Sequence, residues 1–224
     1  MRAIGPEGAS ELEFNRFIVT HGRTWRRQLN AARELPALVL EFVKLLTSPI
    51  FWSAGGGRGD NHSVMVIPGY GVSDWQMSTL RNWLRRLGCQ PMLSGIRTNP
   101  GWSEELVEAL GSKVKAEARR AGRRVTLIGH SLGGLQGRSV ALRHPDSVRH
   151  LIALGAPFRF ASGAVSQAVA ITSLYTRFDL SFEPRAREPH AHNIEVQGTH
   201  GGLVINKRVY DLLAKFFCEP DLQR

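Results

Sequence analysis

Short apolar runs alternate with longer amphipathic segments over most of the chain. Apolar runs of about 4–8 residues are typical of strands, and apolar residues three or four positions apart are typical of helices. The predicted strands are residues 63–68, 90–94, 125–129, 148–154, 170–175 and 194–197, and the predicted helices are 79–87, 104–120, 132–143 and 203–217. This alternation predicts an α/β fold, with a mostly parallel sheet of about six strands and helices on both faces.

The first 60 residues show a different pattern. Residues 11–33 are polar and Arg-rich and are predicted to be helical. A second predicted helix covers residues 36–47, beginning at Pro36, which suits a first helical turn. Its apolar residues recur at helical spacing, with charged residues on the other side: Leu38, Val39, Phe42, Leu45 and Leu46 against Glu41 and Lys44.

The stretch GGGRG at residues 55–59 indicates a flexible break. It divides the chain into an N-terminal helical arm with its linker, residues 1–60, and a main domain, residues 61–224. The apolar face of residues 36–47 must be buried on something. One interpretation packs this helix on the main domain. The other places it at a membrane surface or at a substrate entry, with positive charge from Arg23, Arg26, Arg27 and Arg33.

Composition narrows the class of protein. Hydrophobic residues make up 42% of the chain and charged residues 21%, as in globular proteins. No charge-free stretch reaches the roughly 18 residues of a spanning helix. The N-terminal residues lack the basic-then-apolar pattern of a secretory signal. We therefore expect a cytoplasmic protein, with peripheral association at the membrane as the alternative.

The net charge bears on macromolecular partners, and the cysteines bear on metal binding. A net charge of +10 suits nucleic acid or an anionic membrane surface. Because the sequence contains no long basic run and no nucleic-acid-binding module, no nucleic-acid partner is expected. Cys89 and Cys218 have no Cys or His neighbour at metal-binding spacing, so they are predicted to be free thiols. No metal site and no cofactor is predicted.

The strongest chemical signal is GHSLGG at residues 129–134, between a predicted strand and a predicted helix. A G-x-S-x-G sequence in this context makes a sharp turn that exposes the serine. The turn leaves Ser131 at a helix N-terminus, where free N–H groups and partial positive charge suit a developing oxyanion. Ser131 is therefore the predicted nucleophile.

A serine of this kind is followed along the chain by an acid and then by a histidine, at the C-terminal ends of strands. Among the histidines after Ser131, only His200 follows the C-terminal end of a predicted strand, so His200 is the predicted base. Asp179 follows strand 170–175 and is the predicted acid, which would fix the tautomer of His200. Glu183 is the reserve candidate for the acid.

Two backbone N–H groups should bind the oxyanion. One is predicted to be that of Leu132, which follows the nucleophile. The other is predicted to be that of Tyr70, in the loop PGYG at residues 68–71 after the first strand of the main domain. Asp74 and Trp75 are candidates for the wall of the substrate pocket.

These residues resemble the lipase and esterase branch of the α/β-hydrolase family over about residues 62–217. The markers are VMVIPGYG, LIGHSLGG, ALRHPDSVRHLIALGAPF, TSLYTRFD and IEVQGTHGGLVINKRVYDLLAKFF, and the last two are similar to bacterial triacylglycerol lipase-like proteins. The resemblance implies the same roles for Ser131, Asp179, His200, Tyr70 and Leu132.

Two departures from the family pattern stand out. Many relatives have His-Gly at the oxyanion loop, where this chain has Pro68-Gly69, which changes how the loop is supported. The space for a lid, residues 155–169, is too short for a full helical cap. We therefore expect a minimal or absent lid, with the site open or covered by the N-terminal arm.

The resemblance implies a carboxylic-ester hydrolase that acts on lipid-like or other apolar acyl esters. It would work through a Ser-Asp-His triad and an acyl-enzyme intermediate, without a cofactor. An acyltransferase or an amidase would use the same triad. A non-catalytic membrane-surface binding protein on a hydrolase scaffold is the alternative from another class, and the intact triad argues against it.

Overall fold

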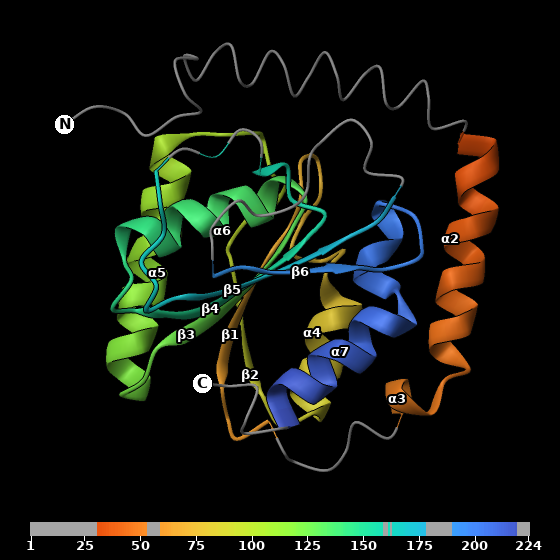
Figure 1. Cartoon of the computed structure of the whole chain (residues 1–224), viewed down its shortest axis with the longest axis horizontal. Helices are drawn as coiled ribbons and strands as arrows, with labels where there is room; N and C mark the ends of the chain where they lie inside the picture. The colour runs from red at the N-terminus through yellow and green to blue at the C-terminus, as the bar shows by residue number, and fades with distance from the viewer. Residues whose placement is uncertain (1–30, 53–58, 159–160, 162, 178–189, 219–224) are drawn as a thin grey trace.

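Six parallel strands form one sheet in the order β2-β1-β3-β4-β5-β6 (Figure 1). The structure is a computed structural model, and it describes residues 31–52, 59–158, 161, 163–177 and 190–218. The strands are β1 (Ser63–Ile67), β2 (Gln90–Leu93), β3 (Val125–His130), β4 (Val148–Leu154), β5 (Ala170–Tyr175) and β6 (His192–Glu195). The predicted parallel sheet is confirmed, although β6 begins two residues earlier than the apolar pattern indicated.

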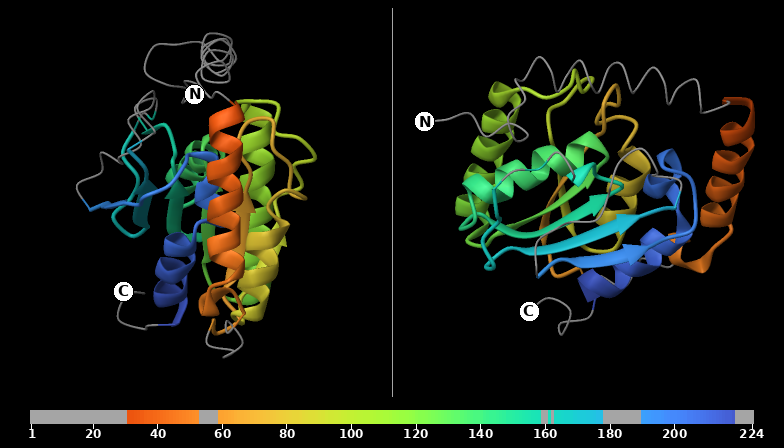
Figure 2. Two further views of the ribbon diagram at one scale, coloured as in Figure 1. Left: turned by 90° about the vertical axis from the view of Figure 1, so that its right-hand side faces the viewer. Right: turned by 45° about the horizontal axis from the view of Figure 1, so that its top comes forward.

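Helices cover both faces of the sheet, as Figures 1 and 2 show. On one face lie α5 (Glu104–Ala121) and α6 (Leu132–Arg143), and on the other lie α4 (Ser78–Arg86) and α7 (Lys207–Cys218). Alternate strand residues feed the two cores: Met65 and Ile67 belong to the first, Val64 and Val66 to the second. This explains why every residue of β1 is buried and why its sequence is uniformly apolar after Ser63.

The part of the arm that the structure describes packs on the second core. It comprises α2 (Ala31–Leu46) and the short helix α3 (Pro49–Trp52). Leu45 and Phe51 are buried. Phe51 is also held by Arg86, whose Nη2 donates to the Phe51 carbonyl oxygen at 2.8 Å and whose guanidinium lies 4.6 Å from the ring centroid. Trp83 Nε1 donates to the Ile50 carbonyl oxygen at 2.9 Å. The helix and the main domain therefore share one hydrophobic core.

Two expectations about the arm need correction. Helix α2 contains Pro36 rather than beginning there, because AARE at residues 31–34 are good helix formers that extend it toward the N-terminus. Glu41 was expected on the solvent side, yet it faces the main domain, whereas Val39 is 55% exposed. The helix has apolar residues on both sides, so periodicity did not decide which side is buried. Most of the other predicted helix, 11–33, lies outside the described residues, which begin at residue 31.

The predicted helix at 203–217 is two elements. A 3₁₀ helix, η2 (Gly201–Ile205), precedes α7. Asn206 separates them, because its Oδ1 accepts from the Arg208 N–H at 2.9 Å and thereby caps α7. Its Nδ2 donates to the Gln197 carbonyl oxygen at 2.9 Å, which ties the start of α7 to the segment after β6.

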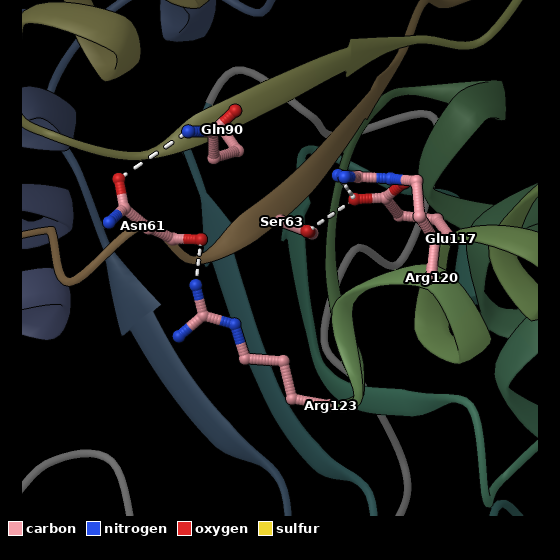
Figure 3. A network of polar contacts seen from close by, with 6 residues as sticks. All are labelled: Asn61, Ser63, Gln90, Glu117, Arg120 and Arg123. Atoms are coloured by element: carbon pink, nitrogen blue, oxygen red, sulfur yellow. Dashed lines mark hydrogen bonds and ion pairs between the residues drawn. The ribbon is translucent and has the colours of Figure 1, made fainter.

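Polar contacts fix the edge where the strands begin (Figure 3). Ser63 Oγ donates to Glu117 Oε1 at 2.5 Å, and Arg120 pairs with the same carboxylate at 2.8 Å, which lowers the pKa of Glu117. Arg123 donates to the Asn61 carbonyl oxygen. These contacts tie β1 to the end of α5 at the edge opposite the C-terminal ends of the strands.

The short segment after β4 carries no α-helix among its described residues, which are 155–158, 161 and 163–169. Ala156, Phe158 and Val165 are buried in the first core. The described part of this segment therefore contributes to the core. Among the described residues, no helix is long and apolar enough to cross a membrane.

Candidate active site

The candidate site lies at the C-terminal edge of the sheet, where β1 and β3 are neighbours. The chain passes from β1 outward to β2, and then returns across β1 to β3. The connections after β1 and β3 thus lead to opposite faces of the sheet, and parallel α/β sheets generally bind their ligands at such a switch point. The loop after β1 carries Tyr70, and the turn after β3 carries Ser131.

Ser131 occupies a strained turn between β3 and α6. Its φ is 52° and its ψ is −121°, a conformation that few non-glycine residues adopt. The Ser131 N–H donates to the Leu154 carbonyl oxygen at 2.8 Å, which fixes the turn to β4. A Cβ atom at Gly133 would lie 2.3 Å from the Ile67 carbonyl oxygen, so only glycine allows this approach. The local structure is that of a nucleophile elbow.

The loop after β1 runs close to the serine. A Cβ atom at Gly69 would lie 3.2 Å from the Ser131 Cβ. Within the part of the chain that the structure describes, the Tyr70 N–H has no hydrogen-bond acceptor. Leu132 is the first residue of α6, and such a residue has no intrahelical acceptor for its N–H. Both N–H groups that the sequence suggested for the oxyanion therefore stand next to the elbow.

A buried amide network supports this loop. Asn99 Nδ2 donates to the Pro68 carbonyl oxygen at 2.8 Å and to Gln136 Oε1 at 2.9 Å. The Gly71 N–H donates to the Asn99 carbonyl oxygen at 2.9 Å. Gln136 lies on α6, and its side chain is fully buried. The loop that begins with Pro68-Gly69 is thus anchored to the elbow helix through Asn99.

His200 lies over the end of β4. A Cβ atom at Gly155 would stand 2.9 Å from the His200 Nδ1, so the ring rests on the Gly155 backbone. Its ring centroid is 5.2 Å from that of His130, the residue before Ser131. His130 Nε2 lies 3.1 Å from the His200 carbonyl oxygen and donates to it in the Nε2-protonated tautomer. The structure therefore brings His200 to the elbow that carries Ser131.

The predicted acid, Asp179, and the reserve candidate, Glu183, lie outside the described residues. The described chain before them ends beside the histidine loop. Strand β5 pairs with β6, and Thr176 Oγ1 donates to the Gly198 carbonyl oxygen at 2.9 Å. The segment that leads toward Asp179 therefore starts next to the segment that leads to His200.

Two buried titratable groups, His150 and Cys89, are poor candidates for acid–base or nucleophilic catalysis. His150 lies in β4, 7% exposed, with its ring centroid 4.4 Å from that of Phe216. Burial lowers the pKa of His150 to about 3. Burial also raises the pKa of the Cys89 thiol to about 12, which makes the thiolate scarce at neutral pH. Among the described residues, no three His, Cys, Asp or Glu side chains converge on a metal position.

Sequence reasoning missed four supporting residues: Glu41, Asn99, Gln136 and Thr176. Gln136 gave a signal, because it is a polar residue on a helix whose other residues are mostly small or apolar. The remaining three make contacts with residues distant in the sequence, and no local pattern indicates such contacts. Asp74 accepts from Ser94 Oγ at 2.9 Å and from the Gly95 N–H at 2.7 Å. Its carboxylate thus supports a loop, whereas Trp75 is 79% exposed.

Comparison with known proteins agrees with this fold. Residues 118–200 match the family described as the alpha/beta hydrolase fold. A carboxylesterase from Nitrososphaera gargenis is similar in structure, with 14% identity, a TM-score of 0.54, and coverage of 70% of this chain and 90% of that chain. A carboxylesterase from Mesorhizobium loti has 16% identity and a TM-score of 0.53, with coverage of 74% of this chain and 93% of that chain. A lipase-esterase related protein from Clostridium acetobutylicum has 13% identity and a TM-score of 0.52, with coverage of 70% of this chain and 94% of that chain.

A search of curated protein sequences finds no match. At these identities the solved structures share the fold alone. The strand order, the turn between β3 and α6, and the similar solved structures together show that the chain has the α/β-hydrolase fold, which the partial family match supports.

Proposed function

We propose that the protein is a serine hydrolase that cleaves carboxylic esters, with Ser131 as nucleophile, His200 as base and Asp179 as acid. The observation that carries the proposal is the strained turn of Ser131 at the start of α6, beside the Tyr70 loop and the His200 ring. A strained non-glycine residue persists only where the surroundings impose it, and such residues cluster at active sites.

The mechanism follows from these positions. His200 removes the proton from Ser131 Oγ as that oxygen attacks the ester carbonyl. The carbonyl oxygen becomes an oxyanion, which the N–H groups of Tyr70 and Leu132 stabilise. The C–O bond to the alcohol breaks, and the alcohol leaves with the proton from His200. Water, deprotonated by His200, then attacks the acyl-Ser131 ester. The C–O bond to Ser131 breaks, His200 returns the proton to Ser131 Oγ, and the carboxylic acid leaves. Asp179 would hold the imidazole orientation throughout.

Exposed aromatic side chains favour an apolar acyl group. Tyr70 is 37% exposed, and Trp75, just before α4, is 79% exposed. Both belong to the connection after β1 at the candidate site's edge of the sheet. The carboxylesterase and lipase-esterase names of the structural neighbours support an ester as the substrate class. These observations support our proposal that the activity belongs to the lipase and esterase branch.

The test is a panel of p-nitrophenyl esters of increasing acyl length, with wild type and Ser131→Ala. We expect hydrolysis by the wild type and a loss by a factor on the order of 10⁶ in the variant, if it behaves as in subtilisin. Circular dichroism should show the same fold for both. Equal hydrolysis by both proteins would refute the proposal. Acyl transfer to an added alcohol in preference to water, or cleavage of the matched anilide alone, would favour an acyltransferase or an amidase.

The outer face of α2 supports a second proposal, peripheral binding to an anionic lipid surface. The outer face comprises Leu35, Val39, Phe42 and Val43, which are 63%, 55%, 37% and 47% exposed. These apolar side chains are neighbours at helical spacing on the exposed side of α2. The net charge of +10 and the arginines of residues 16–33 complement anionic headgroups.

Co-sedimentation with phosphatidylcholine vesicles, with and without phosphatidylserine, tests this binding. The wild type should pellet with the anionic vesicles at low salt, and Val39→Ser/Val43→Ser should pellet much less. Leu93→Ser is the control, because Leu93 is an exposed apolar residue on the edge strand β2. Pelleting that is absent or insensitive to the double substitution would contradict the proposal. A dimer that the double substitution dissociates would assign this face to self-association instead.

A further inference from the structure

Helix α2 brings a carboxylate to the loop that carries His200. Glu41 Oε1 accepts from the Thr199 N–H at 2.7 Å, although the two residues are 158 positions apart in the sequence. Thr199 directly precedes His200. Figure 2 shows α2 standing beside the C-terminal part of the chain, which allows this contact.

Backbone encloses the carboxylate. A Cβ atom at Gly202 would lie 1.8 Å from Glu41 Oε2, and one at Gly198 would lie 3.2 Å from both carboxylate oxygens. Only a residue without a side chain lets the carboxylate enter at Gly202. Glu41 Oε2 is buried and has no hydrogen-bond partner among the described residues. Burying a carboxylate oxygen without a partner costs free energy, which makes this placement unusual and suggests a role for the contact that Oε1 makes.

The contacts of the loop suggest such a role. Among the described residues, the segment 198–200 makes polar contacts with three parts of the chain that are distant in the sequence. Thr176 binds the Gly198 carbonyl oxygen, His130 lies against the His200 carbonyl oxygen, and Glu41 binds the Thr199 N–H. His130 is the last residue of β3, and Thr176 directly follows β5, so both contacts come from the main domain. The contact from Glu41 comes instead from the N-terminal arm.

We propose that Glu41 is a positioning residue that fixes the backbone of the His200 loop by accepting the Thr199 N–H. This inference rests on the proposed role of His200 as the base. Without Glu41 the loop relaxes and the imidazole loses its alignment with Ser131. Since Glu41 contacts the loop and not the substrate, its loss lowers kcat and leaves KM for a short soluble ester unchanged.

Glu41→Ala, Glu41→Gln and the control Lys44→Ala test the proposal. Lys44 is an exposed charged residue on the same helix. The readouts are kcat and KM for p-nitrophenyl acetate, and the rate at which a fluorophosphonate labels Ser131. Measurements at a temperature well below each melting point ensure that folded protein is compared. We expect Glu41→Ala to lose up to about 100-fold in kcat and in labelling rate, because a misplacement of about 1 Å can slow catalysis on this scale.

Glu41→Gln retains an oxygen that can accept from Thr199, so it should keep most of the rate, and Lys44→Ala should match the wild type. The proposal is overturned if folded Glu41→Ala reacts as fast as the wild type, or if Glu41→Gln is as slow as Glu41→Ala. A wild type that the probe does not label would instead refute the proposed serine hydrolase itself, so the two failures are distinguishable.

Substitutions at two neighbouring glycines, Gly201 and Gly202, test the same proposal if Glu41→Ala does not fold. In Gly202→Ala the new methyl group meets the Glu41 carboxylate at 1.8 Å and Thr199 Oγ1 at 2.6 Å. In Gly201→Ala it meets only a Leu38 Cδ atom, at an ordinary 3.8 Å. We expect Gly202→Ala to lower kcat and the labelling rate with KM unchanged, and Gly201→Ala to have little effect. Equal rates for the two variants would contradict the proposal.

Discussion

The imidazole of His200 rests on the backbone of Gly155, the residue after β4, where a Cβ atom would stand 2.9 Å from the ring Nδ1. Gly155 directly follows Leu154, whose carbonyl oxygen accepts the Ser131 N–H at 2.8 Å. The end of β4 thus supports the proposed nucleophile through a hydrogen bond and the proposed base through van der Waals contact.

Gly155→Ala should therefore displace the base. The matched control is Gly122→Ala, because the φ angles are similar, 62° and 65°, and a Cβ atom at Gly122 meets nothing within 4 Å. Both substitutions should destabilise the fold by about 1 kcal/mol or more through the left-handed backbone. Only Gly155→Ala should also lower kcat, by up to about 100-fold. Urea unfolding and ester hydrolysis measure the two effects, and equal kcat values would argue against the position of His200.

The amide network under the oxyanion loop gives a second prediction. Asn99→Ala removes hydrogen bonds to the Pro68 carbonyl oxygen and to Gln136, and leaves buried polar groups without partners. Each such group costs about 1–3 kcal/mol of stability. Because the loop carries Tyr70, kcat should fall more than the loss of folded protein explains. Asn82→Ala, at an exposed asparagine on α4, is the control. A variant that is destabilised but keeps its kcat would show that the network serves stability alone.

The identity of the acid is tested by a pair of isosteric substitutions. Asp179→Asn should slow ester hydrolysis by a factor on the order of 10⁴, as in the protease triad, because the imidazole takes the wrong tautomer. Glu183→Gln should leave the rate near that of the wild type. If instead Glu183→Gln is inactive and Asp179→Asn is active, then Glu183 is the acid.

Burial of His150 predicts a pH-dependent stability. Its pKa is about 3 in the folded protein, because burial disfavours the charged ring, whereas an unfolded histidine titrates near 6.5. Between these values the unfolded chain binds a proton that the folded chain does not. The His150 contribution to stability is therefore complete above about pH 6.5 and is lost as the pH falls toward 3, by roughly 1.4 kcal/mol per pH unit at most.

Urea unfolding at pH 7, 6 and 5 measures this loss. His150→Gln should flatten the dependence, since glutamine does not titrate and can still bond to Thr172, whose Oγ1 lies 2.8 Å from the histidine Nε2. His192→Gln, at an exposed histidine, should keep the wild-type slope. The same slope in His150→Gln and in the wild type would mean that another group is responsible.

The sequence predicted the elements that carry the chemistry more accurately than the contacts that support them. The observed bounds of α6, β4 and β5 equal the predicted bounds, because each element is a strongly patterned segment that ends at turn residues. Ser131 was placed at the elbow because the motif is local and fixes its own turn. His200 is proposed as the base because it follows a strand, and parallel topology brings such residues to the same edge of the sheet as Ser131.

The supporting contacts depend on distances that no local pattern contains. Helical periodicity groups Glu41 with Leu38 and Leu45 on one side of α2, but it does not tell that this side meets the loop around His200. Asn99 and Gln136 are 37 positions apart, and their hydrogen bond follows only from the packing of α6 against the loop after β2. Such contacts follow from tertiary packing, which a sequence pattern does not contain.

The most direct test of the central claim is to map where a fluorophosphonate probe attaches to the folded protein. The account predicts one equivalent of probe on the tryptic peptide that contains Ser131, no labelling of Ser131→Ala, and strongly slowed labelling of His200→Ala. Labelling at a different serine, or no labelling of a wild type that is folded by circular dichroism, would contradict the assignment of Ser131 as the nucleophile.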